Sequence, residues 1–165
     1  MEKYQWLNEI NFYTENVLIL KRGDWIGKGS VLVDGATLGV GLELALKIVE
    51  DDDGFTLTGD LSGAGQGPIS IRIAPNDVGT YVIDARILTA ALDGIAKLES
   101  EPNLALVWNE AQTQSGTMTL FLVDTGIACR GFFRENDNTI TWEVLIQPKQ
   151  DVITGENIVS FRPRR

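Results

Sequence analysis

The feature that most constrains the fold of this chain is a succession of about ten short segments between Gly23 and Gln147 in which apolar and polar residues alternate. Alternation with a period of two is typical of half-buried β-strands, because successive side chains point to opposite faces of a sheet. We expect strands at residues 24–33, 40–50, 55–62, 69–73, 81–87, 90–99, 104–108, 118–122, 129–133 and 140–146. An all-β fold follows from this pattern.

The connections between these segments are short and rich in turn residues, for example Asp34-Gly35 and Pro75-Asn76-Asp77. A parallel sheet needs crossover connections of about a dozen residues or more, and the spacing leaves no room for them. The sequence therefore predicts an antiparallel up-and-down meander. The segment 90–99 is ambiguous, since its apolar residues also fit a helical stripe, but Gly94 inside it favours a strand.

Closure of the meander into a barrel is the preferred architecture, because closure removes both edge strands. Glycines within the predicted strands offer relief where a strand bends tightly. They lie at positions 27, 29, 41, 59, 94 and 131. A two-sheet sandwich is the alternative, but it usually requires long connections, and the only candidate is the loop Gly63–Pro68.

The two ends of the chain are predicted to differ from the barrel. Residues 2–14 carry apolar side chains at roughly helical spacing, which indicates a short N-terminal helix packed over one end of the barrel. We divide the chain into an N-terminal helical segment (1–22), a β-barrel (23–148) and a C-terminal tail (149–165).

Composition restricts the partners. The 165 residues include 14 basic and 23 acidic residues, a net charge of −9, which disfavours nucleic acid. The apolar run Val17–Leu20 is far shorter than the ~20 residues of a membrane span. The N-terminus lacks a secretory profile and the chain has a single cysteine, so we expect a cytoplasmic protein.

The absence of histidine narrows the chemistry. It removes the usual general base of hydrolytic triads and the commonest metal and haem ligand. The three adjacent carboxylates Asp51–Asp53 cannot converge on one calcium ion, and the glycine-rich stretch Gly63–Gly67 leads into a strand rather than a helix. Cys129, in an apolar neighbourhood, is predicted to be an inert core residue. We therefore predict no catalytic residues, no metal and no cofactor.

Gly23-Asp24-Trp25 at the start of the first predicted strand, after a short helical segment, resembles the Gly-x-Trp signature of the lipocalins and the wider calycin group. The number of strands is closer to that of the fatty-acid-binding and nitrobindin-like barrels than to the eight-stranded lipocalins. The resemblance implies that Trp25 lies at the closed end of a barrel, under a basic side chain near the last strands, for which Arg130 and Arg134 are available. It also implies a ligand inside the barrel, although haem held through histidine is excluded.

Candidate ligand-binding residues are aromatic side chains near the predicted interior and arginines within predicted strands. They are Trp25, Arg72, Tyr81, Arg86, Trp108, Phe121, Arg130, Phe132 and Trp142. An inward guanidinium would hold a ligand carboxylate by a bidentate pair. The alternatives are that each arginine faces water, that Trp25 is an ordinary core residue, and that Glu143 is a cross-strand partner of Arg130.

The sequence thus favours a protein that binds a small apolar or amphipathic molecule inside a barrel. One alternative is an enzyme on a similar barrel, such as an isomerase or lyase. Another is an interaction module with a filled barrel, which forms a homo-oligomer through its outer face or its N-terminal helix. An exposed apolar patch at Val17–Leu20 would favour this last reading.

Overall fold

The computed structural model describes residues 18–77 and 79–150 of the chain. It contains ten β-strands and, within the described residues, no helix. The strands are β1 (Gly23–Val33), β2 (Val40–Asp51), β3 (Gly54–Gly63), β4 (Gly67–Pro75), β5 (Tyr81–Ile87), β6 (Ala90–Lys97), β7 (Asn103–Trp108), β8 (Gln114–Val123), β9 (Gly126–Glu135) and β10 (Asn138–Pro148). The helix predicted at residues 2–14 lies outside the described residues.

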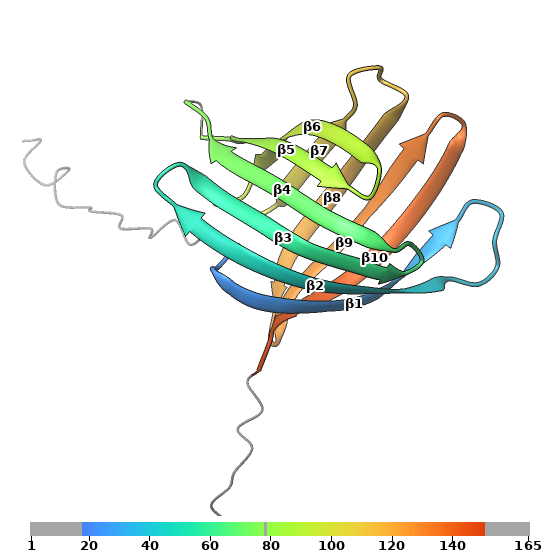
Figure 1. Cartoon of the computed structure of the whole chain (residues 1–165), viewed down its shortest axis with the longest axis horizontal. Helices are drawn as coiled ribbons and strands as arrows, with labels where there is room; N and C mark the ends of the chain where they lie inside the picture. Colours follow the sequence, from blue (N-terminus) through green and yellow to red (C-terminus); the bar gives the residue numbers. More distant parts are fainter. Residues whose placement is uncertain (1–17, 78, 151–165) are drawn as a thin grey trace, which may run out of the picture.

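The ten strands form one closed antiparallel barrel (Figure 1). Each strand pairs with the next along the chain, and β10 returns to pair with β1, from Trp25 opposite Pro148 to Val33 opposite Ile140. The predicted all-β meander and its closure are confirmed, and a sandwich is excluded. The ambiguous segment 90–99 contributes strand β6, so the strand prediction is confirmed there.

The two ends of the barrel differ. The end of the barrel at which β1 begins and β10 ends is called the base. The opposite end, which carries the β1–β2, β5–β6 and β9–β10 turns, is called the mouth. At the base, Ile19 and Leu20 are buried in the core, and the Ile19 amide donates a hydrogen bond to the carbonyl oxygen of Leu98 at 3.3 Å. The described part of Val17–Leu20 therefore does not form the exposed patch that would have favoured an interaction module, because Ile19 and Leu20 close the base and Leu18 is partly buried against the same core.

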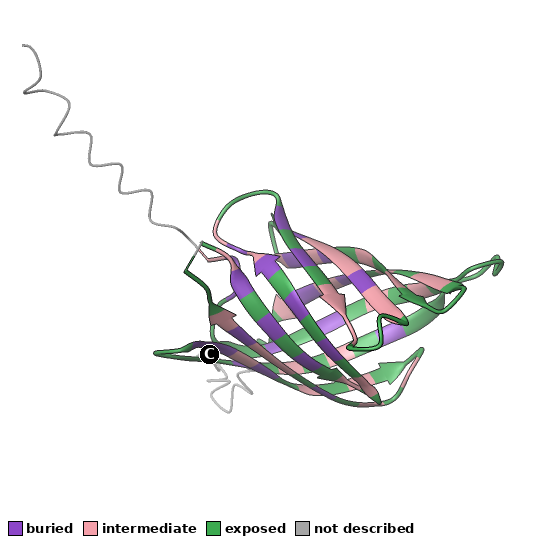
Figure 2. Cartoon of the chain, turned by 90° about the horizontal axis from the view of Figure 1, so that it is seen from above, coloured by how far each residue is buried: buried purple, intermediate pink, exposed green. Residues whose placement is uncertain are grey.

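Burial alternates along the strands, as Figure 2 shows in purple and green. In β1, for example, Trp25 and Gly27 are buried while Asp24, Ile26 and Lys28 are exposed. The buried residues of β1 face the interior. Because directly paired residues share one face of a sheet, the register identifies the inward-facing residues of the other strands. Trp25 faces the interior opposite Leu46 of β2, and Gly29 does so opposite Val144 of β10.

Several inward-facing glycines lie where a neighbouring backbone comes unusually close. A methyl group at Gly59 would lie 1.8 Å from the carbonyl oxygen of Ala45, and one at Gly29 would lie 1.8 Å from that of Glu143. Gly94 and Gly131 meet carbonyl oxygens of β7 and β8 in the same way. The prediction for Gly41 is wrong, since that residue faces outward and a methyl group there would have no neighbour within 4 Å.

Candidate ligand-binding site

The inner wall of the barrel changes from base to mouth. Near the base, inward-facing side chains such as Ile48, Phe55, Leu120 and Ile127 are buried. Toward the mouth, Leu42 and Ile69 are buried, but most inward-facing apolar side chains are only partly buried. The partly buried side chains are Val31, Leu44, Leu61, Ile71, Ile87, Val107, Met118, Phe133, Ile140 and Trp142. Because these side chains point away from the outer surface, their partial exposure means that solvent enters the mouth half of the interior.

The number of strands bears on the room inside the barrel. Side chains fill a barrel of about eight strands, whereas this barrel has ten. Nine inward-facing strand positions hold glycine: Gly23, Gly27, Gly29, Gly59, Gly63, Gly67, Gly94, Gly116 and Gly131. At all of them except Gly23, an atom of a neighbouring residue lies within 3.0 Å of the place where a methyl group would be, so the missing side chains do not themselves leave space. The number of strands is thus the feature that favours room for a ligand.

Trp142 and Phe133 lie over two of these glycines. Cζ2 of Trp142 would be 2.9 Å from a methyl group at Gly131, its direct partner across β9 and β10. Cδ2 of Phe133 would be 3.0 Å from one at Gly116 of β8. Aromatic rings packed on glycine backbone give this side of the mouth a flat apolar surface.

The inner wall carries almost no charge. Among the inward-facing strand positions of the described residues, the ionisable side chains besides Tyr81 and Cys129 are both acidic: Glu50 at the base end of β2 and Glu135 at the mouth end of β9. Oε1 of Glu135 accepts a hydrogen bond from Nε2 of Gln114 at 2.8 Å. The described inner wall therefore presents no cationic side chain that would pair with an anion.

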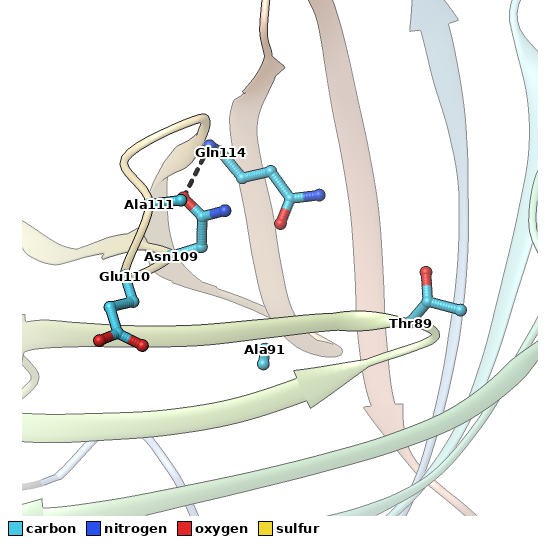
Figure 3. Close-up of a pocket in the computed structure, with 6 residues that line it drawn as sticks. All are labelled: Thr89, Ala91, Asn109, Glu110, Ala111 and Gln114. Carbon is cyan, nitrogen blue, oxygen red and sulfur yellow. Dashed lines mark hydrogen bonds between the residues drawn. The ribbon is translucent and has the colours of Figure 1, made fainter.

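A recess of about 580 Å³, open to solvent, borders the mouth (Figure 3). It lies where β6 and β7 separate, because their ladder ends at Asp93 and Trp108 whereas β6 remains paired with β5 as far as Ala90. Thr89, Ala91, Asn109, Glu110, Ala111 and Gln114 line it. Oδ1 of Asn109 accepts from the Gln114 amide at 2.9 Å, which holds the β7–β8 connection in place.

Three of the predicted ligand-binding residues face the interior: Trp25, Tyr81 and Trp142. Trp25 is buried at the base, and its Nε1 donates to the carbonyl oxygen of Lys21 at 3.0 Å. Tyr81 also lies at the base, where its hydroxyl donates to Oε1 of Glu99 at 2.8 Å. Burial and this hydrogen bond raise the pKa of Tyr81 to about 12. Of the three, Trp142 alone lies in the mouth half.

The three predicted arginines lie on the outer wall. Arg72 pairs with Asp51 at 2.9 Å, Arg86 with Asp84 at 3.5 Å, and Arg130 with Glu143. The expectation that one of them points inward to hold a carboxylate is wrong, and Glu143 is the cross-strand partner that the alternative predicted for Arg130. Arg130 and Arg134 alternate with the inward residues of β9, so neither covers Trp25.

Trp108, Phe121 and Phe132 also face outward. In β7 the sequence pattern Leu104-Leu106-Trp108 marked the wrong face, because Asn103, Ala105 and Val107 point inward. Phe121 and Phe132 alternate with the inward residues Leu120 and Phe133, and the guanidinium of Arg130 lies 5.6 Å from the centre of the Phe121 ring. These three aromatic side chains therefore do not line the interior.

Asn103, the buried polar residue at the base end of β7, is not among the residues predicted from the sequence. Only 5% of it is exposed, and its Oδ1 has no hydrogen-bond partner. Correct phasing of β7 would have revealed it, since Asn103 alternates with Ala105 and Val107. Cys129, by contrast, lies where the sequence placed it, in the core, and burial raises the pKa of its thiol to about 12.

Within the described ranges, no three histidine, cysteine or acidic side chains lie together in a way that would hold a metal ion. The same part of the chain contains no helix long and apolar enough to cross a membrane. The sequence matches no model of a known protein family and no curated protein. The interior wall and the recess at the mouth are thus the features of the described chain that bear on its function.

Proposed function

We propose that this protein binds a small, neutral, largely apolar molecule in the mouth half of its barrel. The observation that carries the proposal is the partly exposed apolar inner wall around Leu44, Met118 and Trp142. Binding sites for small molecules are concave and mostly apolar, with a few placed polar groups. A ligand that covers these side chains would remove apolar surface from water, which stabilises the complex by about 25 cal/mol per Å².

The charge of the wall selects the class of ligand. All three candidate arginines lie outside the barrel, so an acidic head group inside would remain unpaired. Burying a charge without a partner is costly. The amides of Gln114 and Asn109 at the mouth instead suit a neutral polar group, such as a hydroxyl, at one end of the ligand.

Two fluorescent probes that differ in one sulfonate group test this proposal. N-phenyl-1-naphthylamine is neutral, and 8-anilino-1-naphthalenesulfonate has the same ring system with a negative charge. We expect the neutral probe to bind at least about tenfold more tightly, a difference of about 1.4 kcal/mol. Fluorescence titration of the native protein with each probe gives the two dissociation constants.

Neighbouring residues of β2 supply a matched control. Leu44→Trp adds volume to the inner wall and should weaken the neutral probe strongly, whereas Ala45→Trp places the same side chain on the outer wall and should leave binding unchanged. Met118→Trp repeats the inward substitution on β8. Absence of probe binding, or equal weakening by the inward and outward substitutions, would refute the proposed site.

A further inference from the structure

An apolar surface covers the outer wall over β5, β6, β7 and β9. We call it the outer apolar face and define it by Val82, Ile95, Leu104, Leu106, Trp108 and Phe132. Five of these side chains belong to residues that are between 41% and 45% exposed, and Trp108 is partly buried. All three outward positions of β7 are large and apolar, which is unusual for a strand face that meets water.

The register brings these residues into one continuous surface. Val82 lies directly opposite Ile95, and Ile95 lies opposite Leu106. On the other side of β7, Leu106 pairs with Thr117, and Thr117 pairs with Phe132. A single row of neighbouring side chains therefore crosses five strands.

The outer wall over β2 and β3 has a different character. Its outward positions hold Glu43, Lys47, Thr58 and Asp60, all exposed. Exposed apolar side chains do occur on this side of the barrel, such as Ile26 of β1 and Val49 of β2, but they pair directly with Gln147 and Thr56 and not with another large apolar side chain. Contiguous apolar patches on a protein surface mark sites of interaction.

Residues 1–17, outside the described residues, join the barrel close to this face. The chain enters the described part at Leu18, and Ile19 is hydrogen-bonded to Leu98, the residue that follows β6 at the base. Lys97, one residue earlier, is paired with Leu104 of the outer apolar face. The connection between the N-terminal segment and the barrel therefore lies at the base edge of the face.

The sequence of this segment complements an apolar face. Within the predicted helix 2–14, Trp6, Ile10 and Tyr13 recur at the spacing of one side of an α-helix, and Asn8 and Asn11 fall on the opposite side, beside Tyr4. A helix of this length extends about 20 Å, and the six residues of β7 also extend about 20 Å. The segment is thus long enough to cover the face from base to mouth.

We propose that residues 1–17 pack through their apolar side chains on the outer apolar face of the same molecule. Covalent attachment at Ile19 gives the segment an effective concentration near the face in the millimolar range. A separate molecule that competes for the face would need a comparable concentration or a higher affinity. The inference is independent of the interior ligand site, because every residue of the face points away from the interior.

Paramagnetic relaxation enhancement tests the contact in the full chain. A nitroxide is attached through Asn8→Cys, on the side of the segment opposite its apolar stripe. The native thiol of Cys129 is buried and should not react. We expect the NMR signals of Ile95, Leu104 and Leu106 to lose most of their intensity, while those of Glu43 and Asp60 on the opposite wall retain theirs.

Two comparisons make the result decisive. Leu106→Asp should restore the Leu104 signal, whereas Thr58→Asp, an outward substitution on β3, should not. The second comparison mixes nitroxide-labelled protein that contains no ¹⁵N with ¹⁵N-labelled protein that carries no nitroxide. In this mixture the NMR signals of the outer apolar face should stay unchanged. Loss of signal in this mixture would show that a second copy occupies the face and would overturn the proposal, as would unchanged signals in the labelled chain itself.

Discussion

At the scale of single residues, glycine determines how closely neighbouring strands of this barrel approach each other. Gly59 faces inward on β3, and its missing side chain leaves room for the carbonyl oxygen of Ala45. A side chain at this position would force the two backbones apart. Gly41, on β2, faces outward and has open space where a side chain would lie.

These two glycines give a prediction with an internal control. Gly59→Ala places a methyl group 1.8 Å from the Ala45 oxygen, and we expect it to lower the free energy of unfolding by about 1–3 kcal/mol, the usual cost of overpacking. Gly41→Ala should change stability by less than about 1 kcal/mol, because alanine meets no neighbour there and restricts the unfolded chain. Urea denaturation of both variants measures the difference, and equal effects would contradict the assigned close approach.

At the scale of secondary-structure elements, Arg72 connects three neighbouring strands on the outer wall. From β4, its guanidinium donates to both carboxylate oxygens of Asp51 at 2.9 Å and to Oγ1 of Thr56 at 3.0 Å. Asp51 ends β2, and Thr56 lies in β3 directly opposite Arg72. This residue, predicted to bind a ligand, instead ties the base ends of three strands together.

The hydrogen bonds from Arg72, followed by that from the Asp53 amide, hold the pKa of Asp51 below its ordinary value of 3.8. Because the folded state favours the carboxylate, this contribution to stability is present above pH 3.8 and is lost as the pH falls through the lower folded pKa. In Arg72→Gln, the pKa of Asp51 should rise toward 3.8. Carboxyl NMR titration measures this shift, and Arg86→Gln, which alters only the pair with Asp84, should leave the Asp51 pKa in place.

At the scale of the whole molecule, the barrel is asymmetric along its axis. Ile19, Leu20 and Trp25 close the base, where Ile48 and Ile127 are almost fully buried. The mouth has no equivalent cover among the described residues, and its inner wall is partly exposed. A ligand held there would contact strands from all around the barrel and would stabilise the fold as a unit.

This asymmetry predicts a thermal effect. A ligand that binds only the folded state stabilises it by about 2.7 kcal/mol when its free concentration is 100 times the dissociation constant. N-phenyl-1-naphthylamine should therefore raise the Tm of the native protein as its concentration increases. Scanning calorimetry of Leu44→Trp and Ala45→Trp provides the comparison: the increase should disappear in the first and persist in the second, and a Tm that never responds would indicate a filled interior.

The amino-acid sequence by itself determined the number, order and approximate bounds of the strands. Period-two alternation and short turn sequences such as Pro75-Asn76-Asp77 are local signals, and they need no knowledge of the neighbours. Closure also followed from them, because so many short antiparallel segments leave no other place for their edges.

Only the tertiary structure decided which face of β7 points inward. In β7 every residue from Leu104 to Trp108 is apolar, so alternation cannot distinguish its two faces. The register with Gly94 and Met118 turns Val107 and Ala105 inward and Leu104, Leu106 and Trp108 outward. The arginines were equally undetermined, since a guanidinium in a strand fits either side until its partner is known, and the partners Asp51, Asp84 and Glu143 lie on the outer wall. Where a strand is apolar on both faces, its sidedness depends on the strands that pair with it, and the strand by itself does not encode it.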